Sequence, residues 1–173
     1  MCYPCKLGLS LCLSIFLLAS CASILVKPAT SNTSDVSEKA DRIDTTIGEK
    51  AAFTAVSMIG RPYKYRGNSP AGFDCSGLVQ YSYLAAGLDV PHGTKALKAI
   101  TLPIGENMQT GDLLFFNERG KAYSHVGIYL GGDTFVHAPG TGGQVETGSL
   151  EDPHWKSSFV EARRFMEPPE VPR

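Results

Sequence analysis

The spacing of the apolar residues changes halfway along the chain, and this change restricts the fold more than any other feature. In the first half, apolar residues recur at helical spacing, which predicts helices at 49–59, 75–86 and 94–100. In the second half, β-rich runs predict strands at 113–117, 125–130, 134–138 and 159–165. Gly131-Gly132-Asp133 separates two of these runs as a hairpin turn, so neighbouring strands are expected to be antiparallel. The class is therefore α+β, with N-terminal helices packed on a C-terminal antiparallel β-sheet.

The first two expected helices have clear ends and apolar faces. The apolar face of the first helix consists of Ala52, Phe53, Val56 and Ile59. A glycine and a proline just after residue 59 end that helix. The second helix begins directly after Asp74, which is its expected N-cap, and it stops at Gly87.

The length of 173 residues predicts one folded domain, at residues 47–166. Hydrophobic residues make up 43% and charged residues 19% of the chain, which excludes a disordered polyelectrolyte and a multispanning membrane protein. The net charge is -1 and the sequence has no basic run, so nucleic acid is not expected as a partner. We expect the chain to act as a monomer, and any adaptor or inhibitor protein remains unidentified.

The N-terminal segment is typical of an export signal rather than of a membrane span. Lys6 precedes the apolar stretch 7–19, which is shorter than the ~20 residues that a transmembrane helix needs. The following Leu18-Ala19-Ser20-Cys21 resembles the lipobox of bacterial lipoproteins, in which the cysteine is acylated. The alternative is an ordinary signal peptide with an incidental cysteine. Residues 1–20 are thus expected to be removed, and Cys21 is expected to anchor the chain to the membrane.

Two further segments flank the expected domain. Residues 21–46 are rich in Ser, Thr, Asp and Lys, as in a flexible tether, and 167–173 contain three prolines, as in a disordered tail. In lipoproteins an Ala after the acylated cysteine, as in Ala22 here, favours the outer membrane. The expected location is therefore the bacterial cell envelope, with the domain anchored to the outer membrane and facing the periplasm.

Cys75 is the one cysteine of the expected domain, because Cys2, Cys5 and Cys12 leave with the signal and Cys21 carries the lipid. An unpaired thiol in an exported protein indicates either deep burial or a chemical role. Cys75 lies in the first turn of a helix, where backbone N–H groups and the helix dipole can lower a thiol pKa from ~8.5 to roughly 3.5–7.5. The sequence therefore predicts an activated nucleophile. The alternative is a small buried apolar residue.

Two histidines favour the chemical role. His125 opens one expected strand and His137 lies near the end of the next, so their side chains can share one face of the sheet. One imidazole could contact the thiol while the other orients it, as nucleophilic catalysis requires. A metal site formed by these two histidines and Cys75 is an alternative, but the usual ligand spacings are absent. His92 and His154 are interpreted as core histidines with satisfied hydrogen bonds.

Five motifs then carry a resemblance to a known family. They are Gly60-Arg-Pro-Tyr-Lys-Tyr-Arg-Gly67, Gly72-Phe-Asp-Cys-Ser-Gly-Leu-Val79, Gly111-Asp-Leu-Leu-Phe-Phe116, His125-Val-Gly-Ile-Tyr-Leu-Gly131 and Phe135-Val-His-Ala138. In this order and spacing, over residues 48 to 166, the chain resembles the NlpC-type cell-wall peptidases. These are papain-like cysteine endopeptidases of bacterial peptidoglycan, so the resemblance implies a papain-like fold.

The resemblance implies a role for each site residue. Cys75 would be the nucleophile, His125 the general base and His137 the residue that orients His125. The Tyr63 hydroxyl, with the Cys75 backbone N–H, would stabilise the oxyanion, although Tyr63 could instead be a packing aromatic. Asp74 and Ser76 would bind the free amine of the stem peptide, and for Asp74 the N-cap role is equally compatible.

The implied reaction is hydrolysis of the γ-D-glutamyl–diamino acid bond of peptidoglycan stem peptides through a thioacyl-enzyme, without a cofactor or a metal. Tyr65, Arg66 and Pro91-His92-Gly93 depart from the family pattern and are expected to line the groove, which leaves the substrate preference open. Two other functions compete: an amidase or acyltransferase that uses the same Cys-His-His site, and a lipoprotein that only binds wall peptides. The Cys-before-His order and the competent residue at every catalytic position favour hydrolysis.

Overall fold

The computed structural model describes residues 46–140 and 142–166. The predicted export signal, the predicted acylation site at Cys21, the predicted tether apart from Thr46, and the predicted tail at 167–173 lie outside these residues. In the part of the chain that is described, no helix is long and apolar enough to cross a membrane.

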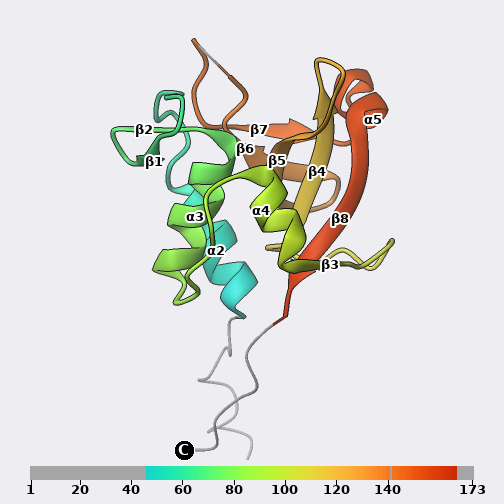
Figure 1. Cartoon of the computed structure of the whole chain (residues 1–173), viewed down its shortest axis with the longest axis horizontal. Coiled ribbons are helices and arrows are strands. Elements are labelled where there is room, and N and C mark those ends of the chain that lie inside the picture. The colour runs from blue at the N-terminus through green and yellow to red at the C-terminus, as the bar shows by residue number, and fades with distance from the viewer. Residues whose placement is uncertain (1–45, 141, 167–173) are drawn as a thin grey trace, which may run out of the picture. The chain divides into compact units, whose positions relative to one another are not determined.

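The helices and strands follow one another in the expected order (Figure 1). The helices are α2 (Ile47–Val56), α3 (Cys75–Ala85), α4 (Thr94–Ala99) and α5 (Pro153–Ser158). The strands are β1 (Asn68–Ser69), β2 (Gly72–Phe73), β3 (Thr101–Pro103), β4 (Leu113–Glu118), β5 (Lys121–Gly131), β6 (Thr134–His137), β7 (Glu146–Ser149) and β8 (Phe159–Phe165). All three predicted helices and all four predicted strands are present, with ends that differ by a few residues.

Six strands form one antiparallel sheet in the order β3-β8-β4-β5-β6-β7, and β1 and β2 form a separate hairpin. The predicted turn between β5 and β6 is confirmed, since Ile128 pairs with Val136 and Gly131 with Thr134. Gly131 and Gly132 have φ values of 103° and 54° in this turn, a conformation that side chains other than glycine rarely adopt. The predicted α+β class with N-terminal helices and a C-terminal antiparallel sheet is confirmed.

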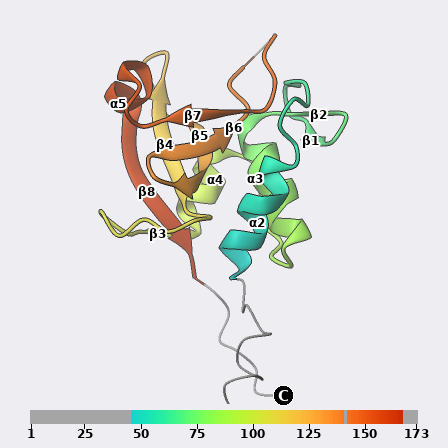
Figure 2. The same cartoon turned by 180° about the vertical axis from the view of Figure 1, so that it is seen from behind.

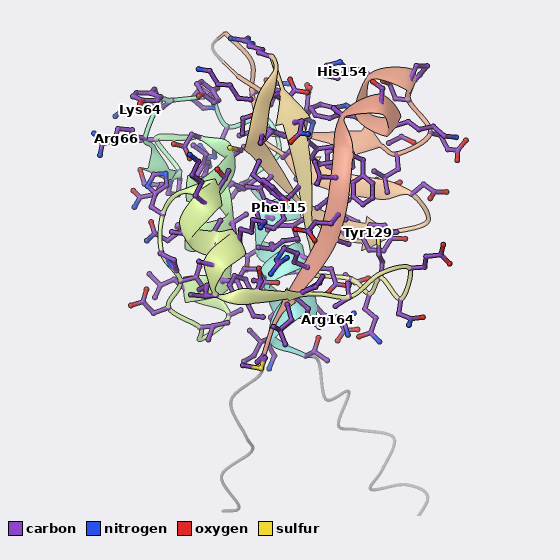
Figure 3. The ribbon with its side chains drawn as sticks, turned by 45° about the vertical axis from the view of Figure 1, so that its right-hand side comes forward. Lys64, Arg66, Phe115, Tyr129, His154 and Arg164 are labelled. Carbon is purple, nitrogen blue, oxygen red and sulfur yellow. The ribbon has the colours of Figure 1, made fainter. Side chains whose placement is uncertain are left out.

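The sheet is buried on both faces. Figures 1 and 2 show α2 and α3 together on one side of the sheet, and α5 beside the end of β8 at which that strand begins. Phe115 and Val126 belong to the core under the helices, whereas Phe116 and Phe135 belong to a second core that includes Trp155 of α5. Figure 3 shows Phe115 on the helix side of β8 and Tyr129 on its other side. Neighbouring residues of β4 therefore serve different cores, as the alternation of side chains along a strand requires.

The predicted apolar face of the first helix is mostly wrong. The buried residues of α2 are Ala51, Ala52 and Ala55. Of the four residues expected there, only Ala52 is buried, and Phe53 is 78% exposed. Alanines allow α2 to pack closely against α3, and this close packing turns the larger side chains outward. The helix begins two residues earlier than expected, where Thr46 and Glu49 form a capping box.

Five short elements were not predicted: β1, β2, β3, β7 and α5. Strands of two to four residues are too short for an alternating pattern to show in the sequence. Helix α5 did carry a signal, because Asp152 accepts hydrogen bonds from the first backbone N–H groups and Pro153 is the first helical residue.

Candidate active site

Cys75 is the first residue of α3, and Asp74 holds the start of that helix. The predicted N-cap is confirmed: the Asp74 Oδ1 atom accepts a hydrogen bond of 2.7 Å from the Gly77 backbone N–H. The backbone N–H groups of Val126, Ser76 and Cys75 lie close enough to the sulfur to favour its thiolate form. Since Val126 follows His125 on β5, the start of α3 lies against the strand that carries the predicted base.

The pKa of the Cys75 thiol moves opposite to the prediction. Burial of the sulfur, followed by the negative charge of Asp74, raises the pKa of the thiol to about 11. The three backbone N–H groups oppose this rise but do not overcome it. The expectation that the helix N-terminus lowers this pKa is therefore wrong, because desolvation disfavours the thiolate more than the N–H groups favour it. This raised pKa favours the protonated thiol at neutral pH.

The Asp74 carboxylate has several donors besides the cap. Ser76 Oγ donates to Oδ1 at 2.9 Å, and the Arg66 backbone N–H donates to Oδ2 at 3.0 Å. His92 Nε2 lies 2.8 Å from Oδ1 and 3.0 Å from Oδ2. The interpretation of His92 as a core histidine is wrong, because its side chain is 28% exposed, but its expected hydrogen bonding is confirmed by the contact with Asp74, the residue before the predicted nucleophile.

Two glycines, Gly67 and Gly77, allow the start of α3 to pack closely on the loop that precedes it. A Cβ atom on Gly77 would lie 1.9 Å from the carbonyl oxygen of Gly67, closer than any real contact. That carbonyl oxygen also accepts the backbone N–H of Asp74 at 2.9 Å. The glycine of the Asp-Cys-Ser-Gly motif therefore lets α3 pack directly on the backbone of the preceding loop, and this packing fixes Cys75 in position.

His125 and His137 form a buried pair on neighbouring strands. Nε2 of His125 lies 3.0 Å from Nδ1 of His137, and the two residues are 4% and 1% exposed. Extending the β5–β6 register places His137 opposite Gly127, which is two residues from His125, so both side chains share one face. The predicted pairing of these histidines is borne out in the structure.

Burial lowers the pKa of both imidazoles. The pKa of His125 falls from 6.5 to about 3, through burial and then through repulsion from His137 and His154. The pKa of His137 falls to about 4, through burial and then through His154. Both rings are therefore neutral at pH 7, and in their shared hydrogen bond one nitrogen donates and the other accepts.

Trp155 of α5 covers this pair and was not among the predicted site residues. Its ring stacks on His125 at 5.3 Å between centroids and meets His137 edge-on at 4.6 Å. It also contacts Phe116 and Phe135, which lie in the same core. The chain contains one tryptophan, and it follows the Asp-Pro signal for a helix start, so a search for short capped helices would have found it.

His154 is the other histidine whose interpretation is wrong. Its side chain is 61% exposed rather than buried in the core, and its Nε2 atom lies 3.0 Å from Glu118 Oε1. Figure 3 shows His154 on α5, at the end of the sheet where β4 turns into β5. His154 thus sets part of the electrostatic environment of the buried pair without belonging to it.

Tyr63 lies within electrostatic reach of the thiol. Burial raises the pKa of the Tyr63 hydroxyl, and the charges of Cys75 and Asp74 raise it further, whereas Arg119 lowers it. Ser76 is buried and its hydroxyl donates to Asp74. The structure therefore gathers Tyr63, Asp74, Cys75 and Ser76 at the start of α3, with the histidine pair on the adjoining strands. Within the described ranges, no group of three or more His, Cys, Asp or Glu side chains could hold a metal ion.

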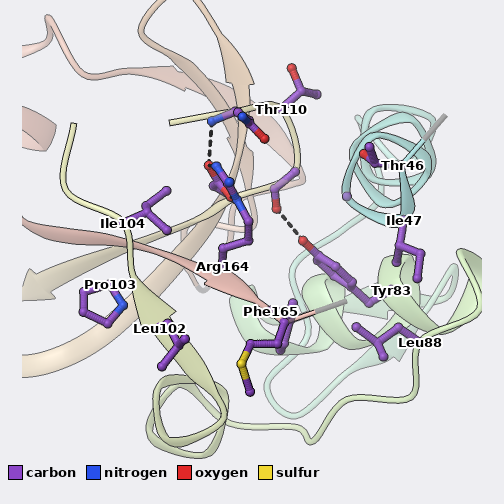
Figure 4. Close-up of a pocket in the computed structure, with 15 residues that line it drawn as sticks. Thr46, Ile47, Tyr83, Leu88, Leu102, Pro103, Ile104, Thr110, Arg164 and Phe165 are labelled. Atoms are coloured by element: carbon purple, nitrogen blue, oxygen red, sulfur yellow. Dashed lines mark hydrogen bonds and ion pairs between the residues drawn. The ribbon is translucent and has the colours of Figure 1, made fainter. Parts of the chain in front are cut away.

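A separate cavity of about 450 Å³ lies where the two ends of the described chain meet (Figure 4). It is lined by Thr46 and Ile47 at one end of the chain and by Phe165 and Met166 at the other. The Tyr83 hydroxyl donates to the Gly111 carbonyl oxygen in its wall. None of the predicted site residues lines this cavity, so it is not the candidate active site.

A cysteine at the start of a helix, packed against a sheet that carries a histidine pair, is the arrangement of papain-like domains. The sequence profile of the NlpC/P60 family matches residues 60–164, which is more than half of the chain. The chain belongs to the NlpC/P60 family.

Relatives of known name agree with this assignment. The chain is 35% identical over 151 residues to the murein DD-endopeptidase MepH of Escherichia coli. The aligned region covers 84% of this chain and 55% of MepH. It is 34% identical over 144 residues to the bifunctional muramidase/DL-endopeptidase CwlT of Bacillus subtilis, covering 81% of this chain and 42% of CwlT. The chain thus spans about half the length of these relatives.

Solved structures show the same fold. A Staphylococcus aureus protein described as similar to lipoprotein, of the NLP/P60 family, superposes with a TM-score of 0.63 at 33% identity, over 77% of this chain and 48% of the other. The NlpC/p60 domain of the peptidoglycan hydrolase SagA gives 0.58 at 35% identity, over 68% of this chain and 98% of that domain. The expected papain-like fold is confirmed.

Proposed function

We propose that the chain is a peptidoglycan hydrolase, a cysteine endopeptidase that cleaves cell-wall stem peptides with Cys75, His125 and His137. The observation that carries this proposal is the buried 3.0 Å contact between His125 Nε2 and His137 Nδ1, together with a Cys75 sulfur that is influenced by the backbone N–H of Val126, the residue after His125. Family membership and relatives named as endopeptidases support it.

The protonation states define the first step. A protonated thiol and a neutral imidazole call for general-base catalysis, in which His125 accepts the Cys75 proton as sulfur attacks the carbonyl carbon. The Nε2 atom of His125 already contacts His137, so its Nδ1 atom is the base. For Nδ1 to be free of a proton, Nε2 must carry one and donate it to His137 Nδ1. His137 therefore selects the tautomer and orientation of His125, the role of the third residue in a triad.

The remaining steps follow from the neighbours of the sulfur. The Cys75 backbone N–H and the Tyr63 hydroxyl would donate to the oxyanion of the tetrahedral intermediate. When the C–N bond breaks, His125 returns the proton to the leaving amine and a thioester remains on Cys75. Water then attacks the thioester, His125 takes its proton, and the thiol is released with the acid product.

Two bonds are candidates for cleavage. We propose the γ-D-glutamyl–diamino acid bond of the stem peptide, and CwlT is a relative named as a DL-endopeptidase. A DD bond of a cross-link is the second candidate, because MepH, at 35% identity, is named as a DD-endopeptidase. Asp74 and Ser76 are proposed to bind the free amine of a stem peptide, in addition to the capping role of Asp74.

Mass spectrometry of defined substrates tests the proposal. L-Ala-γ-D-Glu-diaminopimelate peptides and a cross-linked stem dimer are incubated with the mature chain and with its Cys75→Ala variant. Release of L-Ala-D-Glu by the unmodified chain alone indicates the DL bond, and conversion of the dimer to monomers indicates the DD bond. Cleavage by the Cys75→Ala variant would refute the mechanism. If folded protein with a titratable thiol cleaves neither substrate, the hydrolase proposal fails.

We further propose that Cys21 is acylated and anchors the chain to the outer membrane, with the domain facing the periplasm. The lipobox-like Leu-Ala-Ser-Cys sequence supports this. Intact-mass measurement of the membrane-extracted protein is expected to give a chain that begins at Cys21 and carries acyl groups. A soluble mature chain without them, or an unchanged location of a Cys21→Ala variant, would contradict the proposal.

A further inference from the structure

An open trench of about 880 Å³ lies between α4 and the first half of β5. These two elements contact each other, and Figure 1 shows where they lie in the fold. We call it the basic trench. Its lining includes His92, Lys95, Lys121, Tyr123 and Ser124. A trench of this size can hold part of a peptide.

The basic trench borders the candidate active site at two points. At one, His92 is bonded to Asp74, the residue directly before Cys75. At the other, Ser124 directly precedes His125 on β5. Through the His92–Asp74 contact, the trench opens next to the start of α3, so a peptide bound at Cys75 can extend into it.

The charges of the trench have one sign. Lys95 on α4 and Lys121 on β5 come from opposite walls, and both are exposed. Beyond the wall, Lys98 lies with its Nζ atom 4.3 Å from the centre of the Tyr123 ring and adds a third positive charge. Among the described residues that line the trench, none is a carboxylate. Cations that are not paired within the trench favour an anionic group of a ligand.

We propose that the basic trench is a subsite for a free carboxylate of the substrate peptide, held by Lys95 and Lys121. The proposal rests on the proposed function and adds a substrate class to it. A γ-linked D-Glu keeps its α-carboxylate, and diaminopimelate, which has two carboxyl groups, keeps one free even when a further residue is attached to the other. Amidation replaces such a carboxylate with a neutral group of almost the same shape, so the trench distinguishes free-acid from amidated stems by charge alone.

The expected effect is moderate because both lysines are exposed. Solvent-exposed ion pairs of this kind change affinity roughly two- to five-fold per lysine. The effect must shrink as ionic strength rises, since the Debye length falls to about 8 Å at 0.15 M salt. The lysine substitutions should change KM and not kcat, because a contact away from the scissile bond is made equally in the ground state and the transition state.

The test compares matched peptides and matched variants. Two stem peptides differ only in a carboxylate or a carboxamide, at the D-Glu or at the diamino acid. The Lys95→Gln/Lys121→Gln double variant is compared with the unmodified chain and with Lys50→Gln, an exposed lysine on α2 that does not line the trench. The double variant is expected to raise KM for the free acid at unchanged kcat and to leave the amidated peptide unaffected. Equal KM values for both peptides with the unmodified chain, or an equal change for both with the double variant, would overturn the proposal.

A binding measurement separates this proposal from the hydrolase proposal. Isothermal titration calorimetry on the Cys75→Ala chain, with and without the two lysine substitutions, reports affinity in the absence of chemistry. If neither peptide is cleaved but the free acid binds more tightly through the lysines, the trench is supported and the hydrolase proposal fails. If both peptides are cleaved and bind alike, hydrolysis is supported and the trench proposal fails.

Discussion

Acid should destabilise the fold through the buried histidine pair, by an amount that the structure sets. An unfolded histidine has a pKa of 6.5, whereas the pKa values of His125 and His137 in the fold are about 3 and about 4. Between these limits the unfolded chain binds more protons than the fold. The stability is therefore complete above pH 6.5 and is lost as the pH falls toward the folded values. Each histidine contributes a slope of about 1.4 kcal/mol per pH unit well below pH 6.5.

When this slope is integrated from about pH 7 to about pH 5, the free energy of unfolding falls by roughly 2 kcal/mol for one such histidine and by about 4 kcal/mol for two independent ones. This loss is a large part of the ~5–15 kcal/mol that stabilises a typical domain. Both residues are almost fully buried, so solvent screening does not reduce the effect. Urea unfolding at several pH values, followed by the fluorescence of Trp155, measures it directly.

A His137→Asn variant isolates the contribution of the pair. Asparagine can still accept the hydrogen bond from His125 but does not titrate, so the slope of stability against pH should become shallower by about 1.4 kcal/mol per unit. The comparison uses slopes, so a constant offset in the stability of the variant does not matter. Identical slopes for the two proteins between about pH 6 and pH 5, or a gain in stability on acidification, would refute the account of a neutral buried pair.

Three further perturbations test the site. Trp155→Leu removes the ring that covers the two imidazoles, so their pKa values should rise and the acid limb of the kcat/KM profile should move to higher pH. Trp155→Phe should keep the original profile, and an unmoved limb in the Leu variant contradicts the covering role. Gly77→Ala forces the backbone of the preceding loop away and should lower the free energy of unfolding by about 1–3 kcal/mol or more. The control Gly140→Ala places its Cβ where no atom lies within 4 Å and should cost much less. Similar urea midpoints for both variants would argue against the close approach of Gly77 to the loop. Asp74→Asn retains a side chain that can cap α3 but removes a charge that raises the pKa of Cys75. Alkylation of the thiol should therefore reach its half-maximal rate at a lower pH than in the unmodified chain. An unchanged pH profile of alkylation would exclude the charge effect.

The sequence predicted those features that depend on neighbours along the chain. Asp74 caps α3 because the residue type and its position before an apolar run suffice to identify a cap. The glycine turn between β5 and β6 brings His125 and His137 onto one face for the same reason, because the register of a hairpin follows from its turn. Family resemblance added the identity of the fold, which local patterns alone do not give.

Features that depend on contacts between distant segments were predicted poorly. Phe53 fits a helical stripe but is exposed, because α2 approaches α3 through its alanines. His92 and His154 have no distinguishing neighbours in the sequence, and their partners Asp74 and Glu118 lie 18 and 36 positions away in the numbering. Trp155 reaches the histidine pair from a six-residue helix whose location depends on the whole sheet.

The pKa of Cys75 shows why a local rule can have the wrong sign at such a site. A helix N-terminus lowers a thiol pKa through a few N–H dipoles, and here those dipoles are present. Burial against β5 and the neighbouring charge of Asp74 act in the other direction and are larger. The same burial lowers the pKa of His125, so the proton stays on sulfur in the resting protein. In the proposed mechanism, a neutral pair keeps the sulfur protonated and less open to oxidation than a thiolate until a substrate carbonyl is in place.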